Sequence, residues 1–170
     1  MKKKIVFGFL VLVGIFVITG CGSKKETMVK VMDKKGTSSE MTLNELVDIN
    51  DSNEAKFDEY YVGSTIEFEA TIKKIETNTG VDLGGCTKAT GNPSEITFEK
   101  IDGVIIVLAL EKNSYNLSEF NKGDKIKVKT NITNAFINDE GGKYLKVASY
   151  DGPRPSCDFG KTPTIITKVD

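Results

Sequence analysis

The stretch Ile66-Glu67-Phe68-Glu69-Ala70-Thr71-Ile72-Lys73 decides the fold class, because apolar and polar side chains alternate along it. Successive side chains of a β-strand point to opposite faces, so this period of two predicts a strand with one buried and one solvated face. The same alternation returns in Lys125-Ile126-Lys127-Val128-Lys129-Thr130-Asn131-Ile132. The chain is therefore expected to be mainly β.

Shorter patterns surround these two strands. Thr42 and Glu45 have the spacing of a capping box, which predicts a helix that begins there. A second, acidic helical stretch covers residues 53–61 and ends at Gly63. The unbroken apolar run at 104–110 is typical of a strand that is buried on both faces. The remaining expected elements are strands around 96–98 and 144–148 and one helical turn at 117–120.

A helix, three strands, a helical turn and two further strands is the order of elements around an oligonucleotide/oligosaccharide-binding (OB) barrel. Two blocks carry a closer resemblance. Asn53-Glu54-Ala55 followed by Tyr61-Val62-Gly63-Ser64-Thr65-Ile66, and later Lys122-Gly123-Asp124-Lys125-Ile126-Lys127-Val128, resemble recurring blocks of the extracytoplasmic OB-fold family labelled tRNA-anticodon-like.

This resemblance covers roughly residues 42–150 and implies a five-stranded OB-fold-like barrel. An N-terminal helix would precede the barrel, and a short helical turn would separate strands three and four. The implied domain spans residues 41–152, followed by a C-terminal tail at 153–170. The glycine-rich insertion at 77–94 and the tail after 152 depart from the family pattern, so no binding residue is transferred.

The resemblance also implies that the first and fourth strands of the barrel pair. Glu67 and Glu69 would then face Lys125, Lys127 and Lys129 on the outer surface. Opposite charges across strands stabilise a sheet by roughly 0.2 to 1 kcal/mol each. The lysine stripe is therefore interpreted as part of a set of cross-strand pairs, and its field as largely cancelled.

The N-terminus is typical of a signal sequence. Three lysines at positions 2–4 precede an uncharged segment at 5–20, which as a helix would reach roughly 24 Å, short of a bilayer core of about 30 Å. The run Ile18-Thr19-Gly20-Cys21 resembles the lipobox of bacterial lipoproteins. This implies a signal peptide at 1–20, cleavage before Cys21, a diacylglyceryl thioether on Cys21, and a location on the extracytoplasmic face of the membrane. The alternative is an uncleaved anchor without acyl chains.

Residues 21–40 are rich in Lys, Gly, Ser and Thr and are interpreted mainly as a lipid-anchored tether. A flexible chain of this length spans roughly 25 Å. The alternative is that the apolar patch between Met28 and Met32 adds an edge strand to the domain.

Composition limits the functional classes. The chain has 23 basic and 24 acidic side chains, so removal of the three N-terminal lysines leaves 20 against 24, a net charge of −4. Arg154 is the only arginine, and there is no histidine or tryptophan. This composition disfavours nucleic-acid binding, which needs clustered Lys and Arg with interleaved aromatic side chains. No cofactor motif is present.

Cys86 and Cys157 are the two cysteines that remain if Cys21 is lipidated. In an oxidising compartment they predict a disulfide, which would close a loop of about 71 residues and stabilise the fold by at most roughly 4 kcal/mol. The alternative is two unpaired thiols. Two cysteines without histidine do not favour a zinc site.

One acidic window resembles the ligand spacing of an EF-hand, a calcium-binding loop. The sixth position of the window is Asn53 instead of glycine, and Lys56 stands at the ninth. The alternative is a helix break with acidic residues in the first turn of the next helix, where they interact favourably with the helix dipole. The candidate calcium ligands are Asp48, Asn50, Ser52, Glu54 and Glu59.

The patterns thus favour a non-catalytic binding or interaction module, tethered to the membrane and monomeric as a domain. Its partner would be an envelope protein, a peptide or a glycan. A small-ligand or ion-binding lipoprotein that serves a transporter or sensor is the alternative. A glycan-acting enzyme that uses carboxylates is a weaker one, because no motif singles out a catalytic pair.

Overall fold

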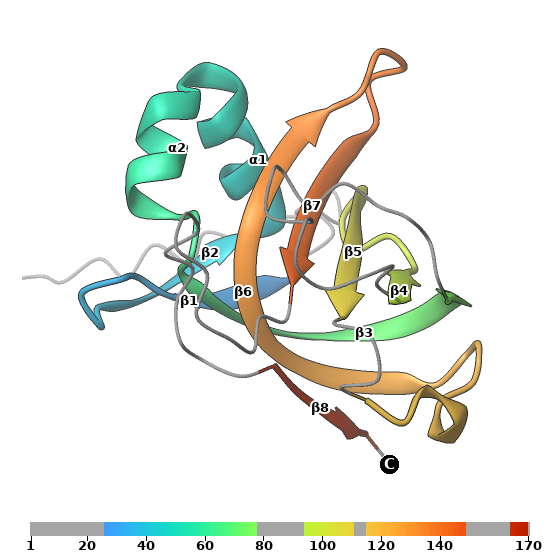
Figure 1. Ribbon diagram of the computed structural model, residues 1–170. Coiled ribbons are helices and arrows are strands. Elements are labelled where there is room, and N and C mark those ends of the chain that lie inside the picture. The colour runs from blue at the N-terminus through green and yellow to red at the C-terminus, as the bar shows by residue number, and fades with distance from the viewer. Residues whose placement is uncertain (1–25, 78–93, 111–114, 149–163, 170) are drawn as a thin grey trace, which may run out of the picture.

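The computed structural model describes residues 26–77, 94–110, 115–148 and 164–169. Within these residues the protein is mainly β, with one eight-stranded mixed sheet and two α-helices (Figure 1). The expectation of a mainly β chain is confirmed, whereas the expected number of five strands is wrong, because three further strands join the sheet.

Five of the strands pair in a closed cycle. β3 pairs with β4, β4 with β5, β5 with β7, β7 with β6, and β6 returns to β3. Only the β5–β7 pairing is parallel. The bounds of the five are Thr65–Glu76 (β3), Ser94–Phe98 (β4), Val104–Leu110 (β5), Lys125–Ile137 (β6) and Lys143–Ala148 (β7).

β6 is the longest strand and contributes to two different parts of the sheet. Its first half pairs with β3, from Thr71 opposite Lys125 to Thr65 opposite Asn131. Its second half pairs with β7, and the register shifts between Ile132 and Asn134 where the strand changes partner. A bulge of this kind bends a strand and increases its twist, and β6 is strongly curved in Figure 1.

The three additional strands lie where the sequence predicted mainly tether and tail. β1 (Met28–Met32) pairs with β2 (Ser38–Thr42) on one side and with β3 on the other. β8 (Ile165–Lys168) pairs with the first half of β6. The tether interpretation of residues 21–40 is therefore wrong for residues 28–32 and 38–40, which belong to strands. The alternative of an edge strand at Met28–Met32 is confirmed as to the strand, in which Val29 and Val31 are buried, but β1 lies between β2 and β3 and not at the edge.

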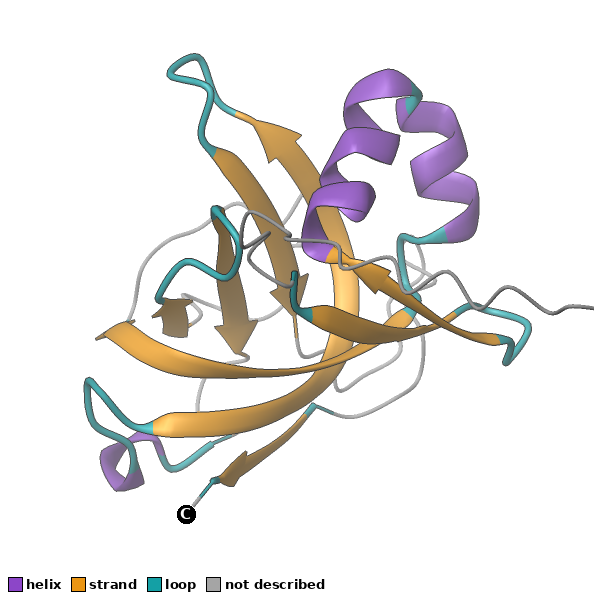
Figure 2. Ribbon diagram, turned by 180° about the vertical axis from the view of Figure 1, so that it is seen from behind, coloured by secondary structure: helices purple, strands orange, loops and turns teal. Residues whose placement is uncertain are grey.

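α1 (Leu43–Ser52) begins at the capping box that the sequence predicted. The Thr42 side chain accepts a hydrogen bond from the Glu45 backbone, and the Glu45 carboxylate accepts one from the Thr42 N–H at 2.7 Å. α2 (Glu54–Tyr60) follows directly, and Asn53 ends one helix and caps the next. Both helices lie on one side of the sheet (Figure 2), where α1 packs against β6 and β7.

The core lies inside the cycle of five strands and extends beneath α1. The inward residues of β5 are fully buried, but its outward residues Ile105 and Val107 are only half-buried. The expectation that residues 104–110 are buried on both faces is therefore only partly met. The helical turn expected at 117–120 is a 3-10 turn at Leu117–Glu119. The largest fully buried side chains include Leu43, Leu46, Phe57, Ile66, Ile72, Ile96, Phe98, Ile106, Leu108, Ile126 and Ile132.

Candidate functional site

The three cysteines singled out from the sequence, Cys21, Cys86 and Cys157, lie outside the described residues. Both the lipidation and the disulfide therefore stay predictions. No helix among the described residues is long and apolar enough to cross a membrane.

The five calcium candidates do not form a loop. Asp48, Asn50 and Ser52 lie inside α1, whereas Glu54 and Glu59 lie in α2. Asp48 contacts Lys143 Nζ at 2.6 Å, and Ser52 donates to the Ile49 carbonyl. Asn50 Nδ2 donates to the Ala135 carbonyl, while the buried Asn50 Oδ1 has no hydrogen-bond partner among the described residues. The described part of the chain contains no group of three or more metal-ligating acidic or cysteine side chains.

Glu54 stands in the first turn of α2 and Asn53 is its cap, as the alternative interpretation expected. The EF-hand hypothesis fails for a physical reason. An EF-hand needs an irregular loop that turns successive oxygens toward one point, whereas a helix distributes residues 48, 50 and 52 around its axis.

The outer surface of β3 and the first half of β6 is a charged face, defined here as Glu67, Glu69, Lys125, Lys127 and Lys129. Lys127 contacts Glu67 at 2.5 Å and Lys125 contacts Glu69 at 2.9 Å. The expected cross-strand pairing is confirmed, although the ion pairs run diagonally because Glu67 lies directly opposite Lys129. The hydrogen bond from Lys127 lowers the pKa of the Glu67 carboxyl below its ordinary value of 4.5.

The outer surface of β5, β7 and the second half of β6 has a different composition. We call it the aromatic face, defined as Ile105, Val107, Phe136, Tyr144 and Lys146. Tyr144 lies beside Ile105 on one neighbouring strand and beside Phe136 on the other. In the next row Lys146 lies beside Val107. All five side chains are half-buried.

Phe136 and Tyr144 form a parallel stack on this face. Their ring centroids are 5.0 Å apart with an interplanar angle of 5°. Lys146 Nζ lies 5.3 Å from the centroid of the Phe136 ring, within the range of a cation–π interaction. Stacked rings that hold each other in place lose little side-chain entropy when a further planar or apolar group packs on them, so this arrangement is suited to binding.

Glu95 on β4 stands at the border of the aromatic face. Burial raises the pKa of its carboxyl above 4.5, and the nearby Lys146 partly opposes that rise. Two glutamates on neighbouring strands, Glu67 on β3 and Glu95 on β4, thus have pKa shifts of opposite sign: the fold stabilises the anionic form of Glu67 and penalises that of Glu95.

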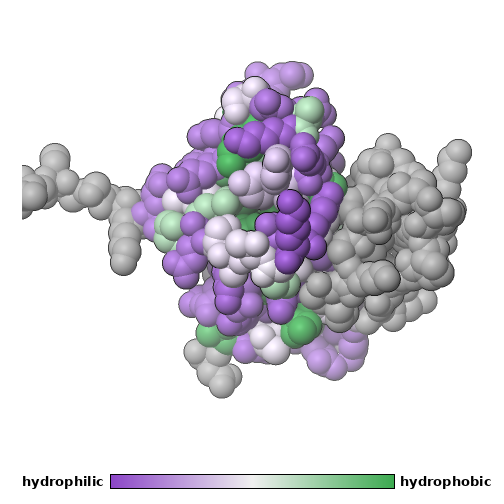
Figure 3. All heavy atoms as spheres, turned by 90° about the vertical axis from the view of Figure 1, so that its left-hand side faces the viewer, coloured by the Kyte–Doolittle hydropathy of each residue, from purple (hydrophilic) through white to green (hydrophobic). Residues whose placement is uncertain are grey.

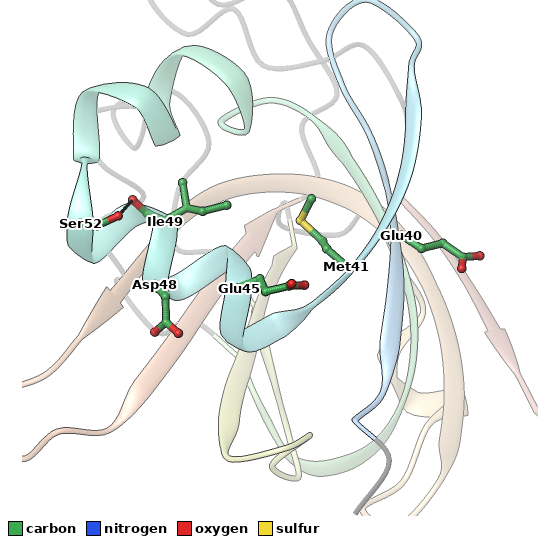
Figure 4. Close-up of a pocket in the computed structure, with 6 residues that line it drawn as sticks. All are labelled: Glu40, Met41, Glu45, Asp48, Ile49 and Ser52. Atoms are coloured by element: carbon green, nitrogen blue, oxygen red, sulfur yellow. Dashed lines mark hydrogen bonds between the residues drawn. The ribbon is translucent and has the colours of Figure 1, made fainter. Parts of the chain in front are cut away.

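A groove of about 550 Å³ lies between β2 and α1 (Figure 4). Met41, Glu45 and Ile49 point toward the space between the two elements, while the Glu40 carboxylate points away from α1. The six lining residues include three carboxylates and no basic side chain, and they are Glu40, Met41, Glu45, Asp48, Ile49 and Ser52. A second hollow of about 300 Å³ lies on the other face of β1 and β2 and shares Glu40.

Neither the aromatic face nor the groove was identified from the sequence. The signal for the aromatic face was the symmetric position of Phe136 and Tyr144 about the turn at 138–142, in which Asn138 donates its backbone N–H to the Gly142 carbonyl. Two residues at equal distance from a hairpin turn form a cross-strand pair. The sequence interpretation ended the strand near Ile132 and so did not include Phe136.

Comparison with known proteins does not add an assignment, since no family model, no curated protein and no solved structure matches the chain.

Proposed function

We propose that this chain is a membrane-anchored, non-catalytic binding module on the extracytoplasmic face of the cell membrane. The domain would be an OB-type barrel, its anchor a diacylglyceryl group on Cys21, and its partner an envelope protein or an exposed part of one. The observation that carries the proposal is the stack of Phe136 on Tyr144 on an outer face.

The OB-type barrel is supported by the closed cycle of β3, β4, β5, β7 and β6, in which β5 and β7, the third and fifth of these strands in chain order, run parallel. OB folds bind their ligands on an outer strand face bordered by connecting loops. The aromatic face shares with that ligand face the third strand, β5, and lies next to the turn between β6 and β7, which corresponds to the loop between the fourth and fifth strands. Aromatic side chains such as Phe136 and Tyr144 are enriched in protein interfaces relative to the rest of the surface.

The binding experiment compares variants of the full chain in its own envelope. Photo-crosslinking from Asn134, an exposed neighbour of the aromatic face, captures the partner. We expect the double substitution Phe136→Ala and Tyr144→Ala to abolish the crosslinked product. Tyr60→Ala is the matched control, since Tyr60 is an aromatic residue on α2 that is 48% exposed. A product that persists in the double variant at native stability would contradict the assignment of this face.

The anchor is tested separately by mass spectrometry of the N-terminal peptide and by cell fractionation. We expect a diacylglyceryl adduct on Cys21 and, in Cys21→Ser, loss of both the adduct and membrane retention, because two acyl chains hold a protein firmly on a bilayer. If Cys21 is unmodified and the chain still starts at residue 1, the proposed lipid anchor is wrong and the protein has an uncleaved anchor.

A small-ligand-binding lipoprotein is the second candidate. It is favoured by the groove between β2 and α1, because about 550 Å³ falls within the range of small-molecule sites. A ligand there raises the melting temperature of the isolated protein, which a partner that binds only in the envelope does not.

A further inference from the structure

The strand β2 has a free edge. Among the described strands β2 pairs only with β1, so it ends the sheet. Asp33 donates its backbone N–H to the Thr37 carbonyl at 2.9 Å, which fixes the hydrogen-bonded register of this hairpin. Hydrogen-bonded and non-hydrogen-bonded pairs alternate along an antiparallel ladder. The backbone groups of Ser38 and Glu40 therefore point away from β1, at positions whose side chains are exposed.

The capping box limits this edge at one end. The Thr42 N–H, which has the same orientation as that of Glu40, is bonded by the Glu45 carboxylate. Beyond it the chain enters α1. The open part of the edge is therefore short, and a strand added there would exchange hydrogen bonds with Ser38 and Glu40.

The two faces beside the edge differ in chemistry. On the α1 face, Met41 and Ile49 offer apolar surface inside the groove, as Figure 4 shows. On the opposite face the Glu40 carboxylate projects beside the smaller hollow. Figure 3 views the side of the molecule that carries the helices, and its surface is mainly hydrophilic with small separate apolar spots.

We propose that the edge of β2 and the groove beside it dock an extended peptide segment of a partner protein in which basic and apolar residues alternate. Side chains of an added strand alternate between the two faces. A basic side chain opposite Glu40 then places its neighbours over Met41 and Ile49. At the rim of the groove Glu45 already accepts the Thr42 N–H and Asp48 is paired with Lys143, so Glu40 is the carboxylate that selects a basic side chain over an acidic one.

Charge also decides against a second copy of this chain as the occupant. Antiparallel pairing of two β2 strands brings Glu40 of one copy close to Glu40 of the other, and like charges across strands are destabilising. Lys30 on β1 lies opposite Glu40, but it also interacts with Glu67 of β3 and is therefore shared between two carboxylates. This docking surface is distinct from the aromatic face, so its test is independent of the proposed function.

The probe is a blocked, dye-labelled hexapeptide of alternating lysine and valine, titrated with the full chain in detergent and followed by fluorescence anisotropy. We expect saturable binding that weakens with added salt, and none for the matched glutamate–valine peptide. Glu40→Gln should weaken binding about threefold, as for an exposed ion pair. Glu59→Gln is the control, because Glu59 is an exposed acid on α2 that does not line the groove.

Two N-methylated peptides test the hydrogen bonds without any change in the protein. Residues that face Glu40 in an antiparallel ladder turn their N–H groups toward β2, so methylation of the lysine nitrogens should weaken binding about tenfold or more. Methylation of the valine nitrogens should have little effect.

Three results would overturn the proposal. One is equal binding of the lysine–valine and glutamate–valine peptides. Another is equal sensitivity to methylation at both sets of nitrogens, or at neither. The third is a concentration-dependent dimer in analytical ultracentrifugation that Glu40→Lys abolishes, which would make a second copy the occupant.

Discussion

Along its first half β6 presents lysines that pair with glutamates of β3, whereas along its second half it presents Phe136 stacked on Tyr144. Both halves share one core. Val128 and Ile132 are equally buried on the inner side. The difference is confined to the outer surface, where the charged face pairs its two glutamates with two of its three lysines and the aromatic face leaves apolar area in contact with solvent. Apolar area of the second kind gains free energy when a partner removes it from water.

The largest expected change in the free energy of unfolding comes from a comparison of an inward with an outward residue of β5. We expect Ile106→Ala to destabilise the protein by about 3 kcal/mol, because Ile106 is fully buried and truncation leaves a cavity. Val107→Ala, at the neighbouring outward position, should cost about 1 kcal/mol or less. Urea unfolding of both variants provides the measurement. Similar losses would show that the aromatic face is part of the core and not an outer surface.

The next largest expected effect is a difference in coupling energy between side-chain pairs on the aromatic face and on the charged face. A double-mutant cycle on Phe136 and Tyr144 should give a coupling energy of about 1 kcal/mol, the usual value for an aromatic pair. The same cycle on Glu69 and Lys125 should give about 0.5 kcal/mol, since both side chains are about half exposed. Added salt should reduce the second coupling and leave the first unchanged. A salt-sensitive aromatic coupling would mean that Lys146 dominates that cluster.

Elements with local signals were predictable from the sequence. Thr42 and Glu45 satisfy each other within one helical turn, so four residues suffice to locate the start of α1. The alternation from Ile66 to Ile72 likewise defines β3 by itself. The pairing of the charged face followed from the resemblance to a barrel, since Glu67 and Lys127 are 60 positions apart in the sequence.

β1 was expected as a strand only in the alternative interpretation, and β8 was not expected as one, because the stability of both depends on partners that are distant in the sequence. β1 buries only Val29 and Val31, and it does so between β2 and β3. β8 has four residues and depends on β6 for its hydrogen bonds. The candidate sites were not identified from the sequence for the same reason. Phe136 becomes a site residue only when β7 brings Tyr144 beside it.

The smallest expected change in stability comes from the opposite pKa shifts of Glu67 and Glu95. The folded state holds the pKa of Glu67 below 4.5, so its ionised form adds stability above that pH, and this is lost as the pH falls through the folded pKa. The folded state raises the pKa of Glu95, so its contribution is greatest below 4.5 and is lost as the pH rises through the folded pKa. Glu67→Gln should therefore lower the urea midpoint at neutral pH, and Glu95→Gln should raise it.

The Glu95 difference should shrink as the pH falls below the ordinary glutamate pKa of 4.5, where that carboxyl is neutral in both states. The Glu67 difference should vanish only at a lower pH, below the folded pKa of that carboxyl. The opposite signs at neutral pH are the informative result, because a simple loss of packing would lower the midpoint in both variants and at every pH. If Glu95→Gln is destabilising at neutral pH, Lys146 is neutralising that carboxylate more than burial penalises it. The cation would then be engaged by the protein's own glutamate, and the aromatic face would offer a partner only its rings.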